Sequence, residues 1–355
     1  MRNLASVQEI LGVSPIEGAD RIELVRVLGW QCVAKKGEFR KGDLCVYFEI
    51  DSFLPVRPEF EFLRASSYKK TELMGEGFRL RTQKFRGQIS QGLVIPVSIL
   101  EEYGWHGTPA GTDVTDLLGV KKWEIEERAT TGGTVVGELP RTVPHTDETR
   151  VQAAPILMQE FEGLDYYIST KMDGSSHSIS IDESGVHVTG HNYEYKDDGS
   201  SSFYEFVKKN GILEKIEQYY REYVAVGDHA ETSSLTVQGE YCGPGIQKNR
   251  LRLMKPEWYV FTVMINGERQ PLPCMSAFCE WSGLTSVPIE ETGHDLPSVY
   301  PDVETLLARA DGEYQNGGRK EGIVIRPVTP VKSETTGDYL SMKVVSNKYL
   351  LKNGD

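Results

Sequence analysis

The strongest constraint on the fold is a run of short β-favouring segments in the first hundred residues. Segments at Arg21–Leu28, Gln31–Ala34 and Leu44–Glu49 are rich in β-branched or aromatic residues, and Gly, Lys-Gly or Asp-Ser turns separate them. Several short strands at this spacing predict a small all-β barrel in this part of the chain.

Two stretches of this region carry a family likeness. Ser14–Val27 (SPIEGADRIELVRV) and Lys36–Pro55 (KGEFRKGDLCVYFEIDSFLP) resemble the OB-type tRNA-binding modules that are attached to some tRNA synthetases. The resemblance implies an all-β OB-type barrel domain that binds nucleic acid.

A basic segment lies in the same region, at Phe78–Gly87 (FRLRTQKFRG). A strand there would direct Arg79 and Arg81 to one face, because alternate residues of a strand share a side. Lys84 and Arg86 extend the positive charge, with an aromatic ring between them. Positive charge interleaved with aromatic rings suits a nucleic-acid backbone, so we predict that these four residues bind nucleic acid. An ordinary solvated strand face is the alternative.

The length of 355 residues favours two or more domains. A Gly-, Thr- and Pro-rich stretch before residue 150 lacks helical or strand periodicity, as a connection would. We predict an OB-like nucleic-acid-binding domain over residues 1–130, a linker over 131–150 and a second domain over 151–355. The second domain alternates strands with a helix at Ser202–Tyr223, which Asn210-Gly211 could interrupt. This mixture predicts an α+β domain built on antiparallel sheets.

The net charge of −13 is unevenly distributed. Residues 1–150 hold 20 Lys and Arg against 22 Asp and Glu, whereas the remainder holds 19 against 30. The acidic excess in the second half is compatible with a cation-dependent phosphate site, which uses clustered carboxylates, but does not require one.

Other features narrow the class of protein by exclusion. The five cysteines are an odd number without a Cys-x-x-Cys pair, which argues against a disulfide framework and a structural zinc site. No apolar run approaches the ~20 residues that span a bilayer, and the N-terminus lacks the layout of a signal peptide. We therefore expect an intracellular protein, cytoplasmic or nuclear, without a membrane partner.

Lys171, the first residue of the tetrapeptide Lys171-Met172-Asp173-Gly174, has two opposed interpretations. It stands between β-favouring residues and an Asp-Gly turn. It could be a surface lysine beside a tight turn, or a nucleophile that a strand presents to a phosphate. Four-residue patterns arise by chance in many chains, so other segments must decide.

Four later segments each carry one residue with a potential chemical role. They are VQGEYCG (Val237–Gly243) with Glu240, WYVFTV (Trp258–Val263) with Phe261, EGIVIRP (Glu321–Pro327) with Glu321, and SMKVVSNKYLL (Ser341–Leu351) with Lys343. Taken singly, they read as a turn, a core aromatic, the exposed start of a strand and a solvated strand lysine. Strand alternation predicts that Phe261 faces opposite to Val260 and Thr262.

In this order the five segments resemble the motifs of the covalent nucleotidyltransferases, the superfamily of ATP-dependent DNA and RNA ligases and mRNA capping enzymes. The OB-like region precedes the motifs, PHTDETRVQ lies just before the second domain, and EYCGPGIQKN begins at Glu240. These features resemble the ATP-dependent RNA ligases with an N-terminal OB module. The resemblance implies a nucleotidyltransferase (adenylyltransferase) domain after the OB-type barrel.

The implied reaction joins a 3′-hydroxyl and a 5′-phosphate of RNA. It passes through a covalent lysyl-AMP intermediate and an adenylylated 5′ end, and it uses ATP with Mg²⁺ or Mn²⁺. The implied partner is RNA, which we expect the OB-type domain to hold as a nicked duplex, and we expect a monomer.

The resemblance assigns catalysis to Lys171 and Lys343. The Lys171 amine would attack the α-phosphorus of ATP, which requires loss of a proton although a free lysine has a pKa of ~10.4. Nearby positive charge lowers such a pKa, and a divalent metal and Lys343 would both supply it. Lys343 would also stabilise charge on the α-phosphate.

The remaining roles concern the metal and the nucleotide. The implied metal ligands are Asp173, Glu240 and Glu321, because Mg²⁺ and Mn²⁺ prefer oxygen ligands. Phe261 would stack on the purine. The implied nucleotide-binding residues are Arg150, Gln152, Lys171, Asp173, Glu240, Phe261, Glu321 and Lys343.

The chain departs from the family pattern at three places. Thr170 stands where many RNA ligases have the glutamate that reads the adenine amino group. His191 stands in Gly190-His191-Asn192 where Ser-Arg-Asn is usual, and Val345 replaces a second lysine, with Lys348 the nearest substitute. These departures affect base recognition and the later steps, and they leave the residues of the first step in place.

Three alternatives stay open. A DNA nick ligase and a capping-type guanylyltransferase share the superfamily motifs. A non-catalytic OB-type RNA-binding protein with a decayed second domain belongs to a different class. The presence of every residue that the first step requires argues against decay.

Overall fold

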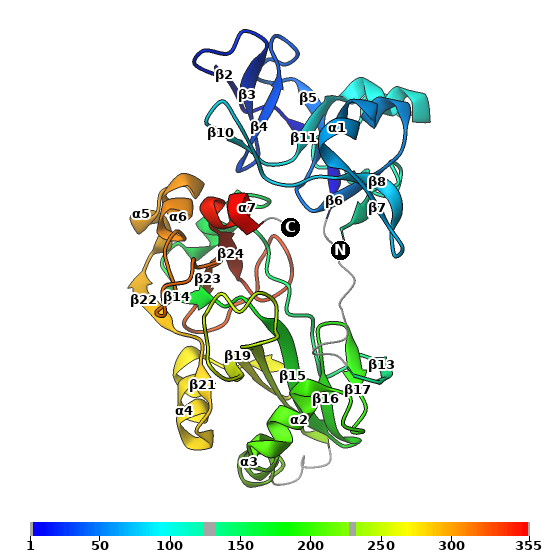
Figure 1. The fold of residues 1–355 in the computed structure, drawn as a ribbon. Coiled ribbons are helices and arrows are strands. Elements are labelled where there is room, and N and C mark those ends of the chain that lie inside the picture. Colours follow the sequence, from blue (N-terminus) through cyan, green and yellow to red (C-terminus); the bar gives the residue numbers. More distant parts are fainter. Residues whose placement is uncertain (1–2, 124–132, 227–231, 354–355) are drawn as a thin grey trace. The chain divides into compact units, whose positions relative to one another are not determined.

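The computed structural model describes residues 3–123, 133–226 and 232–353. The chain forms two compact units, both drawn in Figure 1. The first contains Met1–Glu126, Gln152–Pro155 and Asn347–Asp355, and the second contains Glu127–Val151 and Ile156–Ser346. The predicted boundary between residues 130 and 131 lies outside the described residues, so the predicted division into domains and linker stays a prediction.

The first unit is built from short strands. They are β1 (Ala5–Glu9), β2 (Gly12–Pro15), β3 (Ile22–Val27), β4 (Trp30–Lys35), β5 (Leu44–Phe48), β6 (Ser52–Pro55), β7 (Tyr68–Thr71), β8 (Gly75–Arg79), β9 (Gln83–Phe85), β10 (Gln88–Ser90), β11 (Leu93–Pro96) and β12 (Lys121–Lys122). The short helices are η1 (Pro58–Leu63), α1 (Arg64–Ser67), η2 (Val97–Tyr103) and α7 (Asn347–Asn353). The three segments predicted as strands are β3, β4 and β5.

These strands pair as small antiparallel sheets in the orders β1-β5-β11, β2-β3-β4 and β12-β6-β8-β7, with β9 and β10 as a separate hairpin. The β1-β5-β11 and β12-β6-β8-β7 sheets bury a common apolar core that includes Val46, Phe48, Leu54 and Phe78. The rings of Phe48 and Phe60 meet edge to face at 5.5 Å within it. Burial of these large side chains is the main source of stability for the unit.

The second unit mixes strands and helices. Its strands are β13 (Val135–Glu138), β14 (Asp165–Lys171), β15 (Ser175–Asp182), β16 (Gly185–Thr189), β17 (Tyr193–Tyr195), β18 (Leu235–Cys242), β19 (Glu257–Ile265), β20 (Glu268–Arg269), β21 (Thr285–Ser286), β22 (Ile289–His294), β23 (Gly322–Pro327) and β24 (Met342–Val345). Its helices are η3 (Pro155–Phe161), α2 (Ser202–Lys209), α3 (Ile212–Tyr219), η4 (Tyr220–Val224), α4 (Leu272–Ser282), α5 (Leu296–Val299) and α6 (Val303–Arg309).

The larger sheet of this unit runs β13-β17-β16-β15-β18-β19-β20, with β21 parallel to β19 and all other pairs antiparallel. Helices α2, α3 and α4 bury Phe203, Ile216 and Phe278 in one core with strand residues such as Val237. The predicted Ser202–Tyr223 helix is interrupted between α2 and α3, as expected. Gly211 makes this break, because its φ of 67° is a left-handed conformation that favours glycine.

The smaller sheet, β22-β14-β23-β24, positions the predicted catalytic residues. Lys171 ends β14 and pairs with Gly322, the first residue of β23. Lys343 on β24 pairs with Val324 on the other side of β23. Three neighbouring strands therefore bring Lys171, Glu321 and Lys343 together from distant parts of the sequence.

None of the helices in the described residues is both long and apolar enough to cross a membrane.

The Gly322 position tests how closely these strands must approach. A Cβ atom at Gly322 would lie 2.1 Å from the Val344 carbonyl oxygen, so β23 and β24 approach too closely for a side chain. We expect Gly322→Ala to lower the free energy of unfolding by ~1–3 kcal/mol through overpacking, measured by urea denaturation. Gly137→Ala is the matched control, because Gly137 also lies in a strand but has nothing within 4 Å of its Cβ position. Equal stability of the two variants would contradict the close approach.

Candidate active site

The lysine singled out by the sequence is held in an ion pair. Lys171 Nζ lies 2.9 Å from Glu321 Oε1, and both side chains are mostly buried. Burial lowers the pKa of Lys171, but the negative charges of Glu321, Glu240 and Asp173 outweigh burial and raise it above the ordinary value. The amine is therefore protonated at neutral pH.

Glu240 lies on β18 beside this pair. Its Oε1 accepts a hydrogen bond of 3.1 Å from the Gly174 amide, which belongs to the predicted Asp-Gly turn. Burial and the neighbouring carboxylate of Glu321 raise the pKa of Glu240 to about 7, although the charge of Lys171 opposes them. Two carboxylates and one ammonium thus leave an excess of negative charge that a cation would relieve.

Asp173 is engaged elsewhere, because its Oδ2 forms an ion pair with Arg250 Nη1. Within residues 3–123, 133–226 and 232–353, the structure contains no group of three His, Cys, Asp or Glu side chains arranged to hold a metal ion. Of the three predicted metal ligands, the structure places Glu240 and Glu321 near Lys171 and holds Asp173 against Arg250. The metal assignment of these residues stays a prediction.

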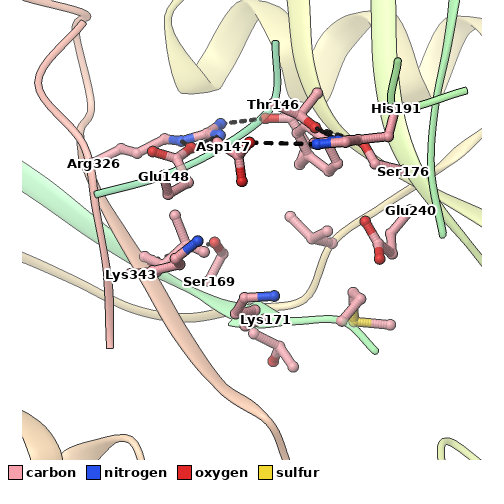
Figure 2. A pocket seen from close by; sticks show the side chains of 15 residues that line it. Thr146, Asp147, Glu148, Ser169, Lys171, Ser176, His191, Glu240, Arg326 and Lys343 are labelled. Atoms are coloured by element: carbon pink, nitrogen blue, oxygen red, sulfur yellow. Dashed lines mark hydrogen bonds and ion pairs between the residues drawn. The ribbon is translucent and has the colours of Figure 1, made fainter. Parts of the chain in front are cut away.

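A cavity lies over the end of β14, and four of the predicted residues line it together: Lys171, Glu240, Phe261 and Lys343. Figure 2 shows Lys171, Glu240 and Lys343 around this cavity, with Glu148 and Arg326 at the side away from Glu240. Val287 and Val324 add apolar walls. An apolar pocket with a few converging polar groups is the usual form of a small-ligand site.

Phe261 reaches this cavity because β19 has a bulge. Gln238 pairs with Thr262 and Gly239 pairs with Val260, so Phe261 has no partner on β18. Val260 belongs to the core under the helices, as expected. Thr262 Oγ1, however, accepts a 3.1 Å hydrogen bond from Arg326, whose guanidinium also lies 5.7 Å from the Phe261 ring centroid. The prediction that Phe261 faces opposite to Thr262 is therefore wrong, because a bulge breaks strand alternation.

Arg150 and Gln152 do not line the cavity. Arg150 pairs with Lys343 as an isolated parallel bridge, and Lys343 donates its amide to the Thr149 carbonyl at 2.8 Å. The buried Gln152 belongs to the first unit, where its carbonyl accepts a hydrogen bond from the Gly29 amide at 2.9 Å. Their predicted contacts with the nucleotide stay predictions.

A buried ion pair in the cavity wall was not predicted from the sequence. Arg326 donates to Glu148 Oε1 and, at 2.6 Å, to the Phe261 carbonyl. Burial raises the pKa of Glu148, but the charges of Arg326 and Arg269 outweigh it and lower the pKa to about 2. The signal was an arginine directly after the apolar run Ile323–Ile325, since an arginine is buried only with a partner.

A polar group around His191 also lines the cavity. His191 Nε2 lies 3.4 Å from Asp147 Oδ2, and Thr146 Oγ1 lies 2.8 Å from Ser176 Oγ. His191 therefore occupies the cavity wall at the position where the family pattern has an arginine.

The four basic residues of the first unit are not equivalent. Strand β8 ends at Arg79 and β9 begins at Gln83, so the predicted common strand face of Arg79 and Arg81 is not formed. Arg79 is buried, with its guanidinium 4.8 Å from the Trp123 ring centroid. Arg81, Lys84 and Arg86 are exposed, the last two at the β9–β10 hairpin around a half-exposed Phe85.

Comparison with known proteins agrees with this architecture. Residues 4–97 match the model of an OB-fold domain, and residues 164–345 match the model of the RNA ligase family. A comparison with curated protein sequences found no match.

Solved structures of Naegleria gruberi RNA ligase resemble the whole chain. Its structure with PPi has 30% sequence identity and a TM-score of 0.87, with 100% of both chains covered. One mutant with ATP and Mn and another with AMP and Mn each have 30% identity, a TM-score of 0.86 and the same coverage.

The fold and site thus define a nucleotidyltransferase with an N-terminal OB-fold domain. The chain belongs to the RNA ligase family. The predicted family, fold class and enzyme class are confirmed.

We expect the Glu148–Arg326 pair to make the free energy of unfolding depend on pH. Glu148→Gln leaves the Arg326 charge buried without its counter-charge, so we expect a loss of ~3–5 kcal/mol in the free energy of unfolding near pH 7. Because the folded-state pKa of Glu148 is lowered, its contribution is complete above the ordinary value of 4.5 and is lost as the pH falls toward 2.

Urea denaturation of wild type and Glu148→Gln between pH 3 and 7 measures this effect. The stability difference should be constant from pH 6 to 7 and should shrink below pH 4.5. The exposed Glu280→Gln is the control and should match wild type throughout. A difference for Glu148→Gln that grows on acidification would contradict the assignment.

Proposed function

We propose that this protein is an ATP-dependent RNA ligase that joins a 3′-hydroxyl to a 5′-phosphate through a lysyl-AMP intermediate. One observation carries the proposal: Lys171, which is paired with Glu321, lines a cavity together with Glu240, Phe261 and Lys343. A family match from residue 164 to residue 345 includes all these residues.

In the first step, Lys171 Nζ attacks the α-phosphorus of ATP. An N–P bond forms, the bond between the α-phosphorus and the bridging oxygen breaks, and pyrophosphate leaves. The structures of the Naegleria gruberi enzyme with ATP, AMP and PPi support this substrate and these products. Lys343, on the other side of β23, supplies positive charge to the α-phosphate during the displacement.

The Lys171 amine must lose a proton before it can attack, because the charges of Glu321, Glu240 and Asp173 keep it protonated. Glu240 and Glu321 fit a hard divalent cation, since both supply carboxylate oxygens. The raised pKa of Glu240, which burial and the nearby Glu321 carboxylate cause, shows that negative charge is crowded at this point. Bound there together with phosphate oxygens, Mg²⁺ or Mn²⁺ would neutralise the carboxylates that raise the pKa of Lys171. The amine then loses its proton more readily.

The base site lies between Phe261 and the apolar wall. Phe261 offers a ring for stacking, while Arg326 fixes the backbone at that residue through its bond to the Phe261 carbonyl. The Glu148 carboxylate is ionised at neutral pH and adds an acceptor to the same cavity. Arg150, Gln152 and Asp173 are proposed to support the nucleotide from outside the cavity wall.

The later steps move AMP to RNA and then release it. The 5′-phosphate oxygen attacks the lysyl-AMP phosphorus and displaces Lys171, which gives an adenylylated 5′ end. The 3′-hydroxyl then attacks the 5′-phosphorus, and AMP leaves. We propose a nicked duplex as the RNA substrate, a monomer as the active form, and residues 1–130 as the domain that holds the RNA.

Labelling with radioactive ATP tests the first step. Wild type should acquire one AMP at Lys171, and Lys171→Ala should acquire none, because the Lys171 amine is the group that attacks the α-phosphorus. Mass spectrometry of the tryptic peptides locates the adduct. Lys209→Ala, at an exposed helical lysine of the same unit, is the control and should label as wild type. Equal labelling of Lys171→Ala would refute the proposal.

A panel of nicked duplexes separates the alternatives. With RNA, DNA and mixed strands and with ATP or GTP, we expect sealing of nicks with an RNA 3′-hydroxyl strand and ATP. Sealing of all-DNA nicks alone would indicate a DNA ligase, and a preference for GTP would indicate a guanylyltransferase. Absence of any labelled enzyme would favour the RNA-binding alternative.

Substitutions in the basic β9–β10 hairpin of the first unit test whether this hairpin binds RNA. Lys84 and Arg86 are exposed on either side of Phe85. Each contact with a phosphate contributes ~0.9 to the salt dependence of duplex binding, so we expect Lys84→Ala/Arg86→Ala to weaken binding of a nicked duplex and reduce the slope by ~1.8. Electrophoretic mobility shifts over a range of NaCl concentrations measure this slope. Lys35→Ala/Lys36→Ala, an exposed basic pair of the same unit, should keep the wild-type slope; an equal change in both double variants would argue against a specific role for the hairpin.

A further inference from the structure

The hydroxyl of Tyr314 lies between the main chains of the two ion-paired residues. It donates a hydrogen bond of 2.9 Å to the Lys171 carbonyl and accepts one of 3.2 Å from the Glu321 amide. The Tyr314 side chain is buried. One oxygen atom thus joins the end of β14 to the residue that precedes β23.

The two Tyr314 hydrogen bonds lie where the pairing between β14 and β23 ends. Lys171 and Gly322 are the last pair in the ladder between β14 and β23, so Glu321 lies beyond it. Lys171 is followed by the Asp-Gly turn rather than by further strand. The Glu321 main chain is also held on the β24 side, where its carbonyl accepts a hydrogen bond of 2.8 Å from the Ser346 amide. The Tyr314 hydroxyl adds the contact that links the main chain of Glu321 to that of Lys171.

Tyr314 is itself rigidly placed. It belongs to a tight turn in which its amide donates to the Gly318 carbonyl at 2.6 Å and its carbonyl accepts from the Gly317 amide at 2.8 Å. Its ring packs in a small buried cluster with Met172, Leu251 and others. A fixed donor of this kind can hold a strand end in place.

A second contact, made by Glu290, holds the residues directly before Lys171 and Glu321. Glu290 on β22 accepts a 2.7 Å hydrogen bond from Thr170 Oγ1 and two of 2.8 Å from the buried Lys320 Nζ. Thr170 precedes Lys171, and Lys320 precedes Glu321. Glu290 is held in turn by Arg309 at 2.8 Å. The threonine that departs from the family pattern therefore has a structural partner.

The alternative is that Tyr314 is a core tyrosine whose hydroxyl bonds to whatever carbonyl is nearest. A satisfied hydroxyl alone would affect stability and would leave the rate of chemistry unchanged. Two independent contacts that converge on residues 170–171 and 320–321 favour a role in geometry.

We propose that Tyr314 is a positioning residue for adenylylation, with Glu290 as its second support. Its hydroxyl fixes the Lys171 and Glu321 backbones so that Lys171 Nζ is aimed at the α-phosphorus. The inference rests on the proposed function. A misplacement of about 1 Å at a reacting atom can cost ~100-fold in rate, so a small backbone shift suffices for a large effect.

Single-turnover adenylylation at increasing ATP concentration tests this role. Tyr314→Phe keeps the ring and removes the hydroxyl. We expect its rate at saturating ATP to fall about 10- to 100-fold while the ATP concentration for half-saturation stays within about twofold of wild type. The matched control is Tyr220→Phe, because the Tyr220 hydroxyl donates to a main-chain carbonyl of the same unit, that of Ser233, at 3.0 Å.

Thr170→Val removes the second support with little change of shape, and we expect a smaller loss of the same kind. Thermal unfolding of each variant shows whether it is folded. A wild-type rate at saturating ATP in folded Tyr314→Phe overturns the proposal, as does a change confined to half-saturation. A wild-type rate in Thr170→Val overturns the support from Glu290. Failure of wild type to label is a different result, because it refutes the proposed function itself.

Discussion

The ion pair between Lys171 and Glu321 is the interaction on which the site depends. It joins opposite charges at the ends of neighbouring strands, 2.9 Å apart and mostly buried. A carboxylate buried there without a counter-charge would be costly, so the pair stabilises this end of the sheet. The same pair thus holds both strand ends together and keeps the lysine protonated.

Sequence patterns predicted the residues whose position follows from their own strand. Lys171, Glu240, Phe261 and Lys343 each lie in a short segment with a clear β pattern, and the structure brings all four to one cavity. The break at Gly211 was also predictable, because glycine favours the left-handed conformation found there. These predictions needed only local chemistry and the order of the segments.

Features that depend on long-range packing could not be predicted in this way. Glu148 and Arg326 are 178 residues apart, and only the folded sheet shows that they pair. Arg79 reads as a surface arginine until its packing over Trp123 is seen. Helix α4 was missed because its sequence, LPCMSAFCEWS, is mainly apolar and lacks a distinct polar face.

The bulge in β19 makes residue count, rather than residue identity, the constraint on this strand. Between Val260 and Val263, both in the core under the helices, two successive residues point to the cavity side. Deletion of one residue there would restore strict alternation and leave the core face intact, yet it would remove either Phe261 from the cavity or Thr262 from its hydrogen bond with Arg326. Insertions and deletions in this strand should therefore be tolerated less well than conservative substitutions.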